Sequence, residues 1–319
     1  MKTVLVTGAA GFIGSNLTKT LLEEGYRVVG IDNFDDTYDP RLKEAQIAPF
    51  LTDPNFVLHR IDIRDLPVLT EVFKTENPSY VVHLAAKADT RKAVDAPRLY
   101  VSVNIDGTLN ILELCREYPV ENLVLASSSS VYGNSSQAPF TEDQPADRPI
   151  SPYGATKRSV EHLAHTYHHN FGMNATCLRY FNAYGENNRP IMLPYIWAGQ
   201  LLRGEEMELS GAGTRKRDFT YIGDIVRGTI LAMEKPLGFE ILNLGNNTPV
   251  SLAELLAIFE KVIGTKAKIH SRPSTKPSVE VTYANIDKAK RLLGWEPTTT
   301  LEAGITKLVA WFRANRLAQ

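Results

Sequence analysis

The first half of the chain alternates short apolar runs with longer stretches whose apolar residues recur at helical spacing. The short runs are rich in β-branched residues and predict strands. They span residues 4–6, 28–31, 56–59, 81–85, 123–126 and 176–180. Between them, Ile13, Leu17 and Leu21 fall on one helical face, and residues 104–116 repeat the pattern. This alternation predicts an α/β fold, a doubly wound parallel sheet covered by helices on both faces.

The second half departs from this pattern. Residues 127–149 are rich in Ser, Pro, Gln and Asp and predict a loop, after which Ser151 and Pro152 predict a helix start. Beyond about residue 182, residues 219–222 are expected to return a strand to the main body, and Pro249–Ser251 to begin a helix. The expected domains are residues 1–181, with 218–245 partly returning to them, and a smaller α/β lobe of residues 182–217 and 246–319.

The composition is that of an ordinary soluble globular protein. Of 319 residues, 43% are hydrophobic and 22% charged, and the formal net charge is −1. Balanced charge provides no field for nucleic acid or an anionic membrane, so neither partner is expected. No apolar run approaches the ~18 residues of a membrane span, and the first residues lack a signal-peptide core, which favours the cytoplasm. Cys115 and Cys177 lie in apolar stretches and are expected to be buried thiols.

Three glycines, Gly8, Gly11 and Gly14, follow the first predicted strand and open the first predicted helix. In this position they permit a tight turn, let the backbone approach a pyrophosphate, and allow close packing of helix on strand. Asp32 ends the second strand, where a carboxylate accepts from ribose hydroxyls and repels a 2′-phosphate. The pattern therefore predicts a Rossmann-type domain that binds NAD. Asp62 and Ile63 after the third strand either hold the adenine edge or simply end a strand.

A second motif points to proton transfer. Tyr153 and Lys157 are four residues apart, which places both on one helical face, and Ser128 follows the fifth strand. Tyrosine is a poor base at its reference pKa of about 10, but a nearby ammonium favours the phenolate, and a serine hydroxyl shares the travelling proton. Lowering that pKa to near neutral needs ~4 kcal/mol, which Lys157 and a nicotinamide cation are expected to supply together.

These motifs together resemble the extended short-chain dehydrogenase/reductase family, which includes nucleotide-sugar epimerases and dehydratases. The resemblance covers nearly the whole chain and rests on TGAAGFIG (7–14), HLAA (83–86), SSSSVYG (127–133), SPYGATK (151–157), RYFNAYG (179–185), RKRDFTYIGDI (215–225), LNLGN (242–246) and LLGWEP (292–297). Within the family, the stretch DNFDDTYDPRLKEA (32–45), the serine cluster and Arg189-Pro190 are similar to UDP-glucuronate 4-epimerases.

The resemblance implies a catalytic triad of Ser128, Tyr153 and Lys157, with Ser128 chosen because it lies four positions before Tyr132. The implied NAD site comprises Gly8, Gly11, Phe12, Ile13, Gly14, Asp32, Asn33, Asp62, Ile63, Leu84, Ala85, Ala86, Asn104, Tyr153, Lys157 and Tyr180. The implied UDP-sugar site comprises Ser129 and Ser130 facing the sugar, Asn182 and Arg217 on the diphosphate, Arg189 near the C6 substituent, and Lys276 or Arg272 in place of a family arginine. The expected reaction is oxidation at C4, rotation of the sugar and hydride return.

Some residues depart from the uronate branch and keep other substrates open. Asn182 stands where that branch usually has Thr, and Ile191 follows Arg-Pro where it usually has Asp. A UDP-glucose/UDP-galactose 4-epimerase is therefore the alternative. More remote alternatives are a UDP-glucuronate decarboxylase, a 4,6-dehydratase, which would have acidic residues at Ser129 and Ser130, and a non-catalytic NAD-binding protein, which would lack the triad.

The helix predicted after Pro152 carries four histidines: His162, His165, His168 and His169. His165 and His169 have the spacing of a metal pair, but no carboxylate or cysteine completes the set, so surface positions and no metal are expected. The family resemblance implies a homodimer formed through residues 104–116 and 152–171 of each protomer.

Overall fold

The computed structural model, which describes residues 1–135, 137–210, 213–272 and 281–316, confirms the α/β fold. A seven-stranded sheet has the order β11-β6-β5-β4-β1-β2-β3, and every neighbouring pair in it is parallel. Its strands are β1 (Thr3–Thr7), β2 (Arg27–Ile31), β3 (Phe56–His59), β4 (Tyr80–His83), β5 (Asn122–Ser128), β6 (Ala175–Tyr180) and β11 (Phe239–Leu244).

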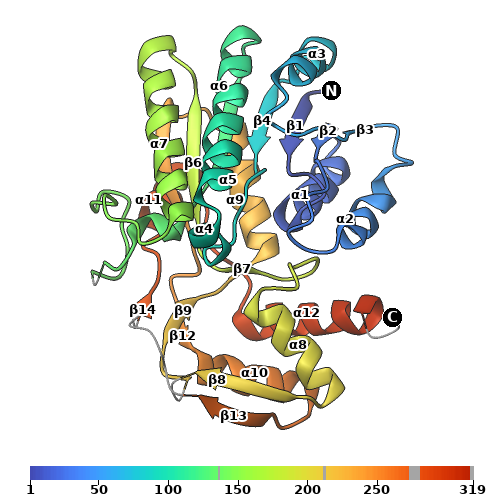
Figure 1. Ribbon diagram of the computed structural model, residues 1–319, viewed down its shortest axis with the longest axis vertical. Helices are drawn as coiled ribbons and strands as arrows, with labels where there is room; N and C mark the ends of the chain where they lie inside the picture. The colour runs from blue at the N-terminus through green and yellow to red at the C-terminus, as the bar shows by residue number, and fades with distance from the viewer. Residues whose placement is uncertain (136, 211–212, 273–280, 317–319) are drawn as a thin grey trace.

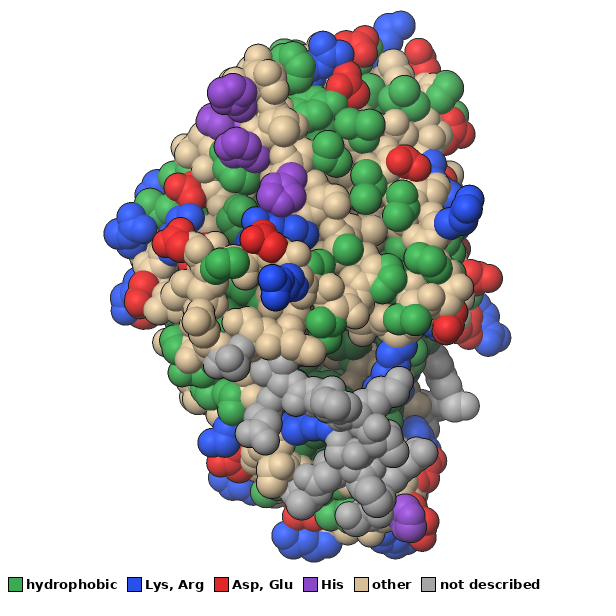
Figure 2. Space-filling view, turned by 60° about the vertical axis from the view of Figure 1, so that its left-hand side comes forward, with side chains coloured by type: hydrophobic (Ala, Val, Ile, Leu, Met, Phe, Trp, Pro, Cys, Tyr) green, Lys and Arg blue, Asp and Glu red, His purple; other side chains and the backbone are tan. Residues whose placement is uncertain are grey.

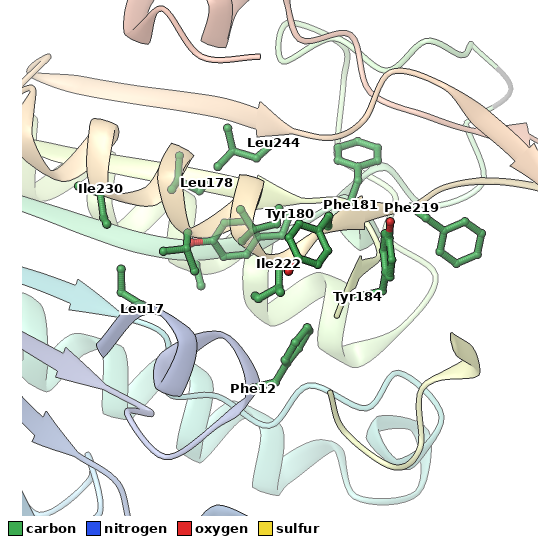
Figure 3. Packing of buried hydrophobic residues seen from close by; sticks show 14 of the residues in the cluster. Phe12, Leu17, Leu178, Tyr180, Phe181, Tyr184, Phe219, Ile222, Ile230 and Leu244 are labelled. Atoms are coloured by element: carbon green, nitrogen blue, oxygen red, sulfur yellow. The ribbon is translucent and has the colours of Figure 1, made fainter. Parts of the chain in front are cut away.

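Helices cover both faces of this sheet because successive strand residues point to opposite sides. Val4 and Val6 of β1 pack in one hydrophobic cluster with α1 (Phe12–Glu23) and α9 (Ile222–Glu234). Leu5, between them, packs in a second cluster with α3 (Leu66–Glu76), α6 (Gly107–Glu117) and α7 (Pro152–Phe171). Figure 1 shows the two helical layers, and Figure 3 shows side chains of α1, β6 and α9 meeting in the first cluster.

The ends of α7, which carries two of the predicted catalytic residues, follow from its sequence. Ser151 accepts a hydrogen bond from the Gly154 N–H, and Pro152 occupies the first turn, where its missing N–H costs nothing. Gly172 ends the helix with φ +68°, a conformation that glycine adopts readily. The predicted start at Ser151-Pro152 is therefore confirmed.

A smaller lobe lies below the carboxyl ends of the strands in Figure 1. It contains α8 (Leu193–Arg203), α10 (Leu252–Ile263) and α12 (Leu301–Arg316), with the parallel pair β8 (Glu206–Ser210) and β13 (Lys268–Arg272), and a sheet of β9 (Lys216–Asp218), β12 (Pro249–Ser251) and β14 (Val281–Thr282). Ser251 and Glu254 form a reciprocal capping box at the start of α10.

The strand expected at residues 219–222 is present but does not join the main sheet, so that prediction is wrong. Thr220–Tyr221 (β10) pairs with Ala183–Tyr184 (β7) in a separate two-stranded sheet. Helix α9 begins at Ile222 directly after it, and β11, which lies beside β6, is the strand that returns to the main sheet. Likewise, the loop expected from residue 127 begins later, because β5 continues through Ser128 and a 3-10 turn spans Ser129–Tyr132.

The remaining helices and helical turns are short. They are α2 (Pro40–Ile47), a 3-10 turn (Ala48–Phe50), α4 (Lys92–Asp95), α5 (Pro97–Val101), a π-helical turn (Ser102–Asp106) that leads into α6, and α11 (Asp287–Leu293). Within the described residues, no helix combines the length and apolarity that a membrane crossing requires. The histidines of α7 lie on the molecular surface (Figure 2), except His168, which is half-buried.

Candidate active site

A cavity of about 490 Å³ opens at the carboxyl ends of the parallel strands. Its walls come from the residues directly after β1, β2, β4, β5 and β6, and from one face of α7. Strand β1 lies at the point where the strand order reverses, between β2 and β4. Ligands of doubly wound sheets bind at such switch points, because the loops there diverge and leave a crevice.

The glycine turn forms one wall of this cavity. Gly8 has φ +72°, and a Cβ on it would lie 2.9 Å from the Ala85 nitrogen. A Cβ on Gly14 would lie 2.0 Å from the Gly8 carbonyl oxygen, so the helix approaches the turn only because this residue is glycine. Helix α1 begins at Phe12 without a side-chain cap. Its uncapped N–H groups and positive dipole end therefore suit an anion such as a phosphate.

Asp32 lies beside the glycine turn and is buried. Its two carboxylate oxygens accept from the Ala10 and Phe34 N–H groups at 3.1 and 2.8 Å, and Lys43 Nζ lies 3.6 Å from Oδ1. A carboxylate has about four acceptor positions, so Asp32 keeps capacity for a ligand hydroxyl.

Asp62 also lines the cavity, where its carboxylate accepts from Asn33 Nδ2 at 2.9 Å and pairs with Arg64. Hydrogen bonding from Arg64 lowers the pKa of Asp62 to about 2, so this carboxyl group is ionised at neutral pH. Asp62 is thus a structured member of the cavity wall rather than a solvated strand end.

The three predicted catalytic residues lie together on the cavity wall. Tyr153 and Lys157 project from one face of α7, and Ser128 ends β5. The Ser128 hydroxyl donates to Ser130 Oγ at 3.2 Å and accepts from the Ser130 N–H at 3.1 Å. Lys157 Nζ donates to the Ala126 carbonyl at 2.8 Å, which fixes the ammonium beneath the end of β5.

The proton equilibria of the triad differ from the expectation that Lys157 lowers the pKa of Tyr153. Burial raises the pKa of Tyr153, while hydrogen bonding with Ser128 and the charge of Arg189 act in the opposite direction. Burial also lowers the pKa of Lys157 to about 8, although the nearby Cys177 and Glu161 act to raise it. In the protein alone, desolvation therefore dominates both groups, and the phenolate needs further positive charge from a ligand.

Asn182 and Arg189 also line the cavity, on the segment that follows β6. Asn182 has φ +25° and donates from Nδ2 to the Asp218 carbonyl at 3.0 Å. The Arg189 guanidinium contacts the Ala88 carbonyl and the Met192 sulfur, each at 3.4 Å. Within the described part of the chain it has no carboxylate partner, so its charge is available to an anionic ligand.

Two predicted site residues lie outside the cavity wall. Asn104 is buried outside the cavity wall, and its amide is fully used by the Lys87 backbone and Thr156 Oγ1. Because Thr156 in turn donates to the Tyr153 carbonyl, hydrogen bonds connect Asn104 through Thr156 to the backbone of Tyr153. Arg217 lies on β9 in the smaller lobe, away from the described cavity wall, with Nη1 donating to the Lys216 carbonyl at 2.7 Å. Lys276 falls outside the described residues.

The other predicted residues line the cavity. They are Gly8, Gly11, Phe12, Ile13, Gly14, Asp32, Asn33, Asp62, Ile63, Leu84, Ala85, Ala86, Tyr180, Ser129, Ser130, Asn182 and Arg189, besides the triad.

Sequence reasoning missed an ion pair that joins two loops of the cavity wall. Lys87 Nζ lies 2.6 Å from both Asp35 oxygens and donates to Thr37 Oγ1 at 3.1 Å, which joins the loop after β2 to the loop after β4. The neighbouring Tyr38 hydroxyl lines the same cavity, is buried, and has no hydrogen-bond partner among the described residues. The polar stretch at residues 32–45 was a sequence signal for this loop. Residue spacing does not show that Asp35 in this stretch pairs with Lys87.

The cavity is more cationic than the chain. Its described walls carry the cationic side chains of Lys43, Arg64, Lys87, Lys157 and Arg189 against the carboxylates of Asp32, Asp35 and Asp62. A protein of net charge −1 thus concentrates positive charge where anionic phosphates would bind. No group of three or more His, Cys, Asp or Glu side chains in the described residues is arranged to hold a metal ion.

Comparison with known proteins agrees with this geometry. A family model described as GDP-mannose 4,6 dehydratase matches residues 5–308. The UDP-glucuronate 4-epimerase of Thermodesulfobacterium geofontis is 45% identical over 312 residues, which cover 98% of this chain and 96% of that protein.

Two solved structures are similar over the same length. The UDP-glucuronic acid 4-epimerase from Bacillus cereus, in complex with UDP-glucuronic acid and NAD, matches with a TM-score of 0.91 and 37% identity over 98% of this chain and 99% of that one. The UDP-glucose 4-epimerase of Thermotoga maritima with UDP-glucose matches with a TM-score of 0.87 and 32% identity over the same shares. The chain therefore belongs to the extended short-chain dehydrogenase/reductase family of nucleotide-sugar epimerases and dehydratases.

Proposed function

We propose that the protein is an NAD-dependent UDP-sugar 4-epimerase that interconverts UDP-glucuronate and UDP-galacturonate. The observation that carries the proposal is one cavity that holds a Tyr153–Ser128–Lys157 cluster, a glycine turn and Arg189, which has no carboxylate partner among the described residues. The named relatives with UDP-glucuronate 4-epimerase activity support the same reading.

The residues present fit NAD. The glycine turn leaves room for a diphosphate against the uncapped N–H groups of α1, and Asp32 keeps acceptor capacity for ribose hydroxyls. The Tyr38 hydroxyl, which has no hydrogen-bond partner in the described part of the chain, is a buried donor that a ligand would satisfy. Asp62, Leu84 and Tyr180 would complete the cofactor site, as the sequence predicted.

The mechanism assigns a role to each member of the triad. Tyr153, as the phenolate, takes the proton of the sugar 4-hydroxyl while C4 becomes a ketone, and Ser128 shares that proton through its own hydroxyl. Bound NAD⁺ would accept the C4 hydride and return it to the other face of the sugar. Lys157, held by the Ala126 carbonyl, would stabilise the phenolate and hold the nicotinamide ribose. Tyr153 then returns the proton to the inverted 4-hydroxyl.

Rotation of the keto sugar requires a firm hold on the nucleotide and a loose hold on the ring. Ser129 and Ser130 present only small hydroxyls to the sugar side of the cavity, which leaves the ring room to turn. Asn182 would hold the diphosphate, and Arg189 would bind the uronate carboxylate. Arg217 lies on β9 of the smaller lobe, so it would reach the diphosphate only where the nucleotide extends beyond the described cavity wall. A planar guanidinium suits a carboxylate because the two form paired charge-assisted hydrogen bonds.

Purified protein incubated separately with UDP-glucuronate and UDP-glucose tests the proposal, with products resolved by chromatography. Conversion of UDP-glucuronate alone is the expected result. Conversion of UDP-glucose alone would favour the alternative substrate pair, which the Asn182 position supports. If neither nucleotide sugar turned over, the epimerase proposal would fail.

We further propose that the enzyme is a cytoplasmic homodimer assembled through residues 104–116 and 152–171. Exposed apolar side chains on these helices support it: Leu109 is 38% exposed and Phe171 54% exposed. Figure 2 shows hydrophobic side chains distributed over this face. Analytical ultracentrifugation is expected to give twice the monomer mass, and Leu109→Glu to give a monomer. We also propose two domains. Residues 1–181 with 218–245 bind NAD, and residues 182–217 with 246–319 bind the sugar nucleotide.

Replacing Lys157 should stabilise the protein while abolishing activity. The pKa of Lys157 is about 8 in the folded chain against a reference of 10.5, so burial of the ammonium is unfavourable at pH 7. Between these values the unfolded chain binds more protons, and wild-type stability therefore rises with pH. Lys157→Met should raise the free energy of unfolding at pH 7 by about 1–3 kcal/mol. Loss of the hydrogen bond from Lys157 to the Ala126 carbonyl reduces this gain.

That gain should shrink as the pH approaches 10. Denaturant unfolding of cofactor-free protein at several pH values measures it, because bound NAD would add its own linkage. Lys19→Met, which alters an exposed lysine of α1, serves as the control and should show no such pH trend. A Lys157→Met variant less stable than wild type at pH 7 would contradict the argument.

A further inference from the structure

A buried charged cluster lies behind the triad and is not used by the mechanism above. Its centre is the Glu161 carboxylate on α7, which no solvent reaches. Arg179 binds it with two parallel hydrogen bonds of 2.8 Å, and Ser127 Oγ donates to it at 2.5 Å. The Arg179 guanidinium also stacks over the Tyr132 ring at 4.7 Å.

Each member of this cluster is adjacent to a residue of the active site. Ser127 precedes Ser128 on β5, Arg179 precedes Tyr180 on β6, and Glu161 lies one helical turn after Lys157 on α7. The strand register pairs Ser127 with Arg179 and Ser128 with Tyr180. One carboxylate therefore ties the helix that carries Tyr153 and Lys157 to the ends of both strands that border the reacting groups.

Stability alone does not account for these buried charges. The side chains of Glu161 and Arg179 are 0% and 1% exposed, and desolvation of such a pair often cancels its attraction. A well-packed apolar pair of similar volume would hold the elements together equally well. What the bidentate pair adds is a fixed direction and distance between helix and strands.

We infer that Glu161 is a positioning residue, which with Ser127 and Arg179 sets the register of α7 so that Tyr153 and Lys157 meet Ser128 and the sugar C4. The inference rests on the proposed function, because its consequence is the rate of the C4 step. Proton and hydride transfer are sensitive to placement, and an error of about 1 Å costs on the order of 10²-fold in rate. Glu161 and Arg179 do not line the described cavity, and Ser127, which does, has its hydroxyl bonded to Glu161. Substrate and cofactor contacts should therefore be unaffected.

Arg158 provides an internal control. Its Nη1 donates to the same carboxylate at 2.8 Å, but it belongs to α7 itself, three residues before Glu161. It therefore does not tie the helix to the strands. Arg158→Met should leave kcat within about twofold of wild type.

The test removes the fully buried charges together, and the half-buried Arg158, which loses Glu161, keeps Asp147 at 3.7 Å. The triple variant Ser127→Ala, Glu161→Met and Arg179→Met should fold with NAD bound, keep KM for UDP-glucuronate within about threefold, and lose on the order of 10²-fold in kcat. Single-turnover absorbance of reduced nicotinamide should show the same loss, which places it at the C4 step. A second variant, Glu161→Gln with Arg179→Met, restores only the Ser127 hydrogen bond and should recover part of kcat.

The outcomes distinguish failure of the positioning role from failure of the proposed function. A triple variant as fast as wild type, or one in which KM rises and kcat holds, would overturn the positioning role. Should the triple variant fail to fold, Ser127→Ala alone, which leaves the ion pair intact, must still lower kcat by several-fold, and an unchanged rate would overturn the inference. A wild-type protein inactive on UDP-sugars would instead overturn the proposed function and the inference together.

Discussion

Tyr153→Phe should lower kcat for UDP-glucuronate epimerisation by about 10²- to 10⁴-fold, the range that a positioned acid–base group contributes. The substitution removes only the hydroxyl that exchanges the proton with the sugar 4-oxygen. The ring stays in its buried place between α7 and the cavity, so folding and NAD content should not change. Substrate binding should hold within a few-fold, because the phenol is one contact among many.

The measurement compares kcat, KM and bound NAD for the variant and for Tyr167→Phe. Tyr167 lies on the same helix, is similarly buried, and bonds Glu113 away from the described cavity wall. Tyr167→Phe should keep wild-type activity, which separates loss of the reacting hydroxyl from disturbance of α7. A Tyr153→Phe variant with wild-type kcat would assign the proton transfer to another group.

The parts of the site that sequence reasoning found are those with local signals. Gly8, Gly11 and Gly14 are readable because steric limits act between a turn and the helix that follows it. Tyr153 and Lys157 are readable because a helix places residues four apart on one face, and Ser151-Pro152 marks where that helix begins. The fold class follows from the same kind of short-range periodicity.

What sequence reasoning missed depends on contacts between distant segments. Asn104 has the residue type of a cofactor ligand, but the fold turns its amide toward Lys87 and Thr156. Ser127 and Ser128 are the same residue type in one serine run. Only the alternation of side chains along β5 directs Ser127 to Glu161 and Ser128 to Tyr153. No spacing rule links residue 35 to residue 87 or residue 161 to residue 179.

The wrong prediction for the strand at residues 219–222 has the same origin. The apolar run at residues 219–222 satisfies strand propensity, yet the neighbouring place in the main sheet is taken by β11 beside β6. Which of two apolar runs enters a sheet is decided by the connection that reaches its edge. Here α9 lies between β10 and β11 and crosses the sheet face, so the strand after the helix returns to β6.

Arg189→Met should lower kcat/KM for UDP-glucuronate by about 10²-fold, because truncating one member of a buried charge pair costs at least ~2–5 kcal/mol. Its guanidinium lines the cavity and has no carboxylate partner in the described chain. The segment that carries it lies beside α1, where Asn187 Nδ2 donates to Ser15 Oγ. Arg189→Lys keeps the charge but loses the planar fork, and should fall between the variant and wild type.

The ratio between two substrates isolates carboxylate recognition from a general effect. The charge of Arg189 also lowers the pKa of Tyr153, so its removal should slow proton abstraction from any sugar. That loss is common to UDP-glucuronate and UDP-glucose, whereas loss of the carboxylate contact affects UDP-glucuronate alone. Arg189→Met should therefore shift the UDP-glucuronate to UDP-glucose preference by tenfold or more, on the order of 1.4 kcal/mol. An equal fall in kcat/KM for both substrates would limit Arg189 to an electrostatic effect on Tyr153. The residue that recognises the uronate carboxylate would then lie elsewhere in the cavity.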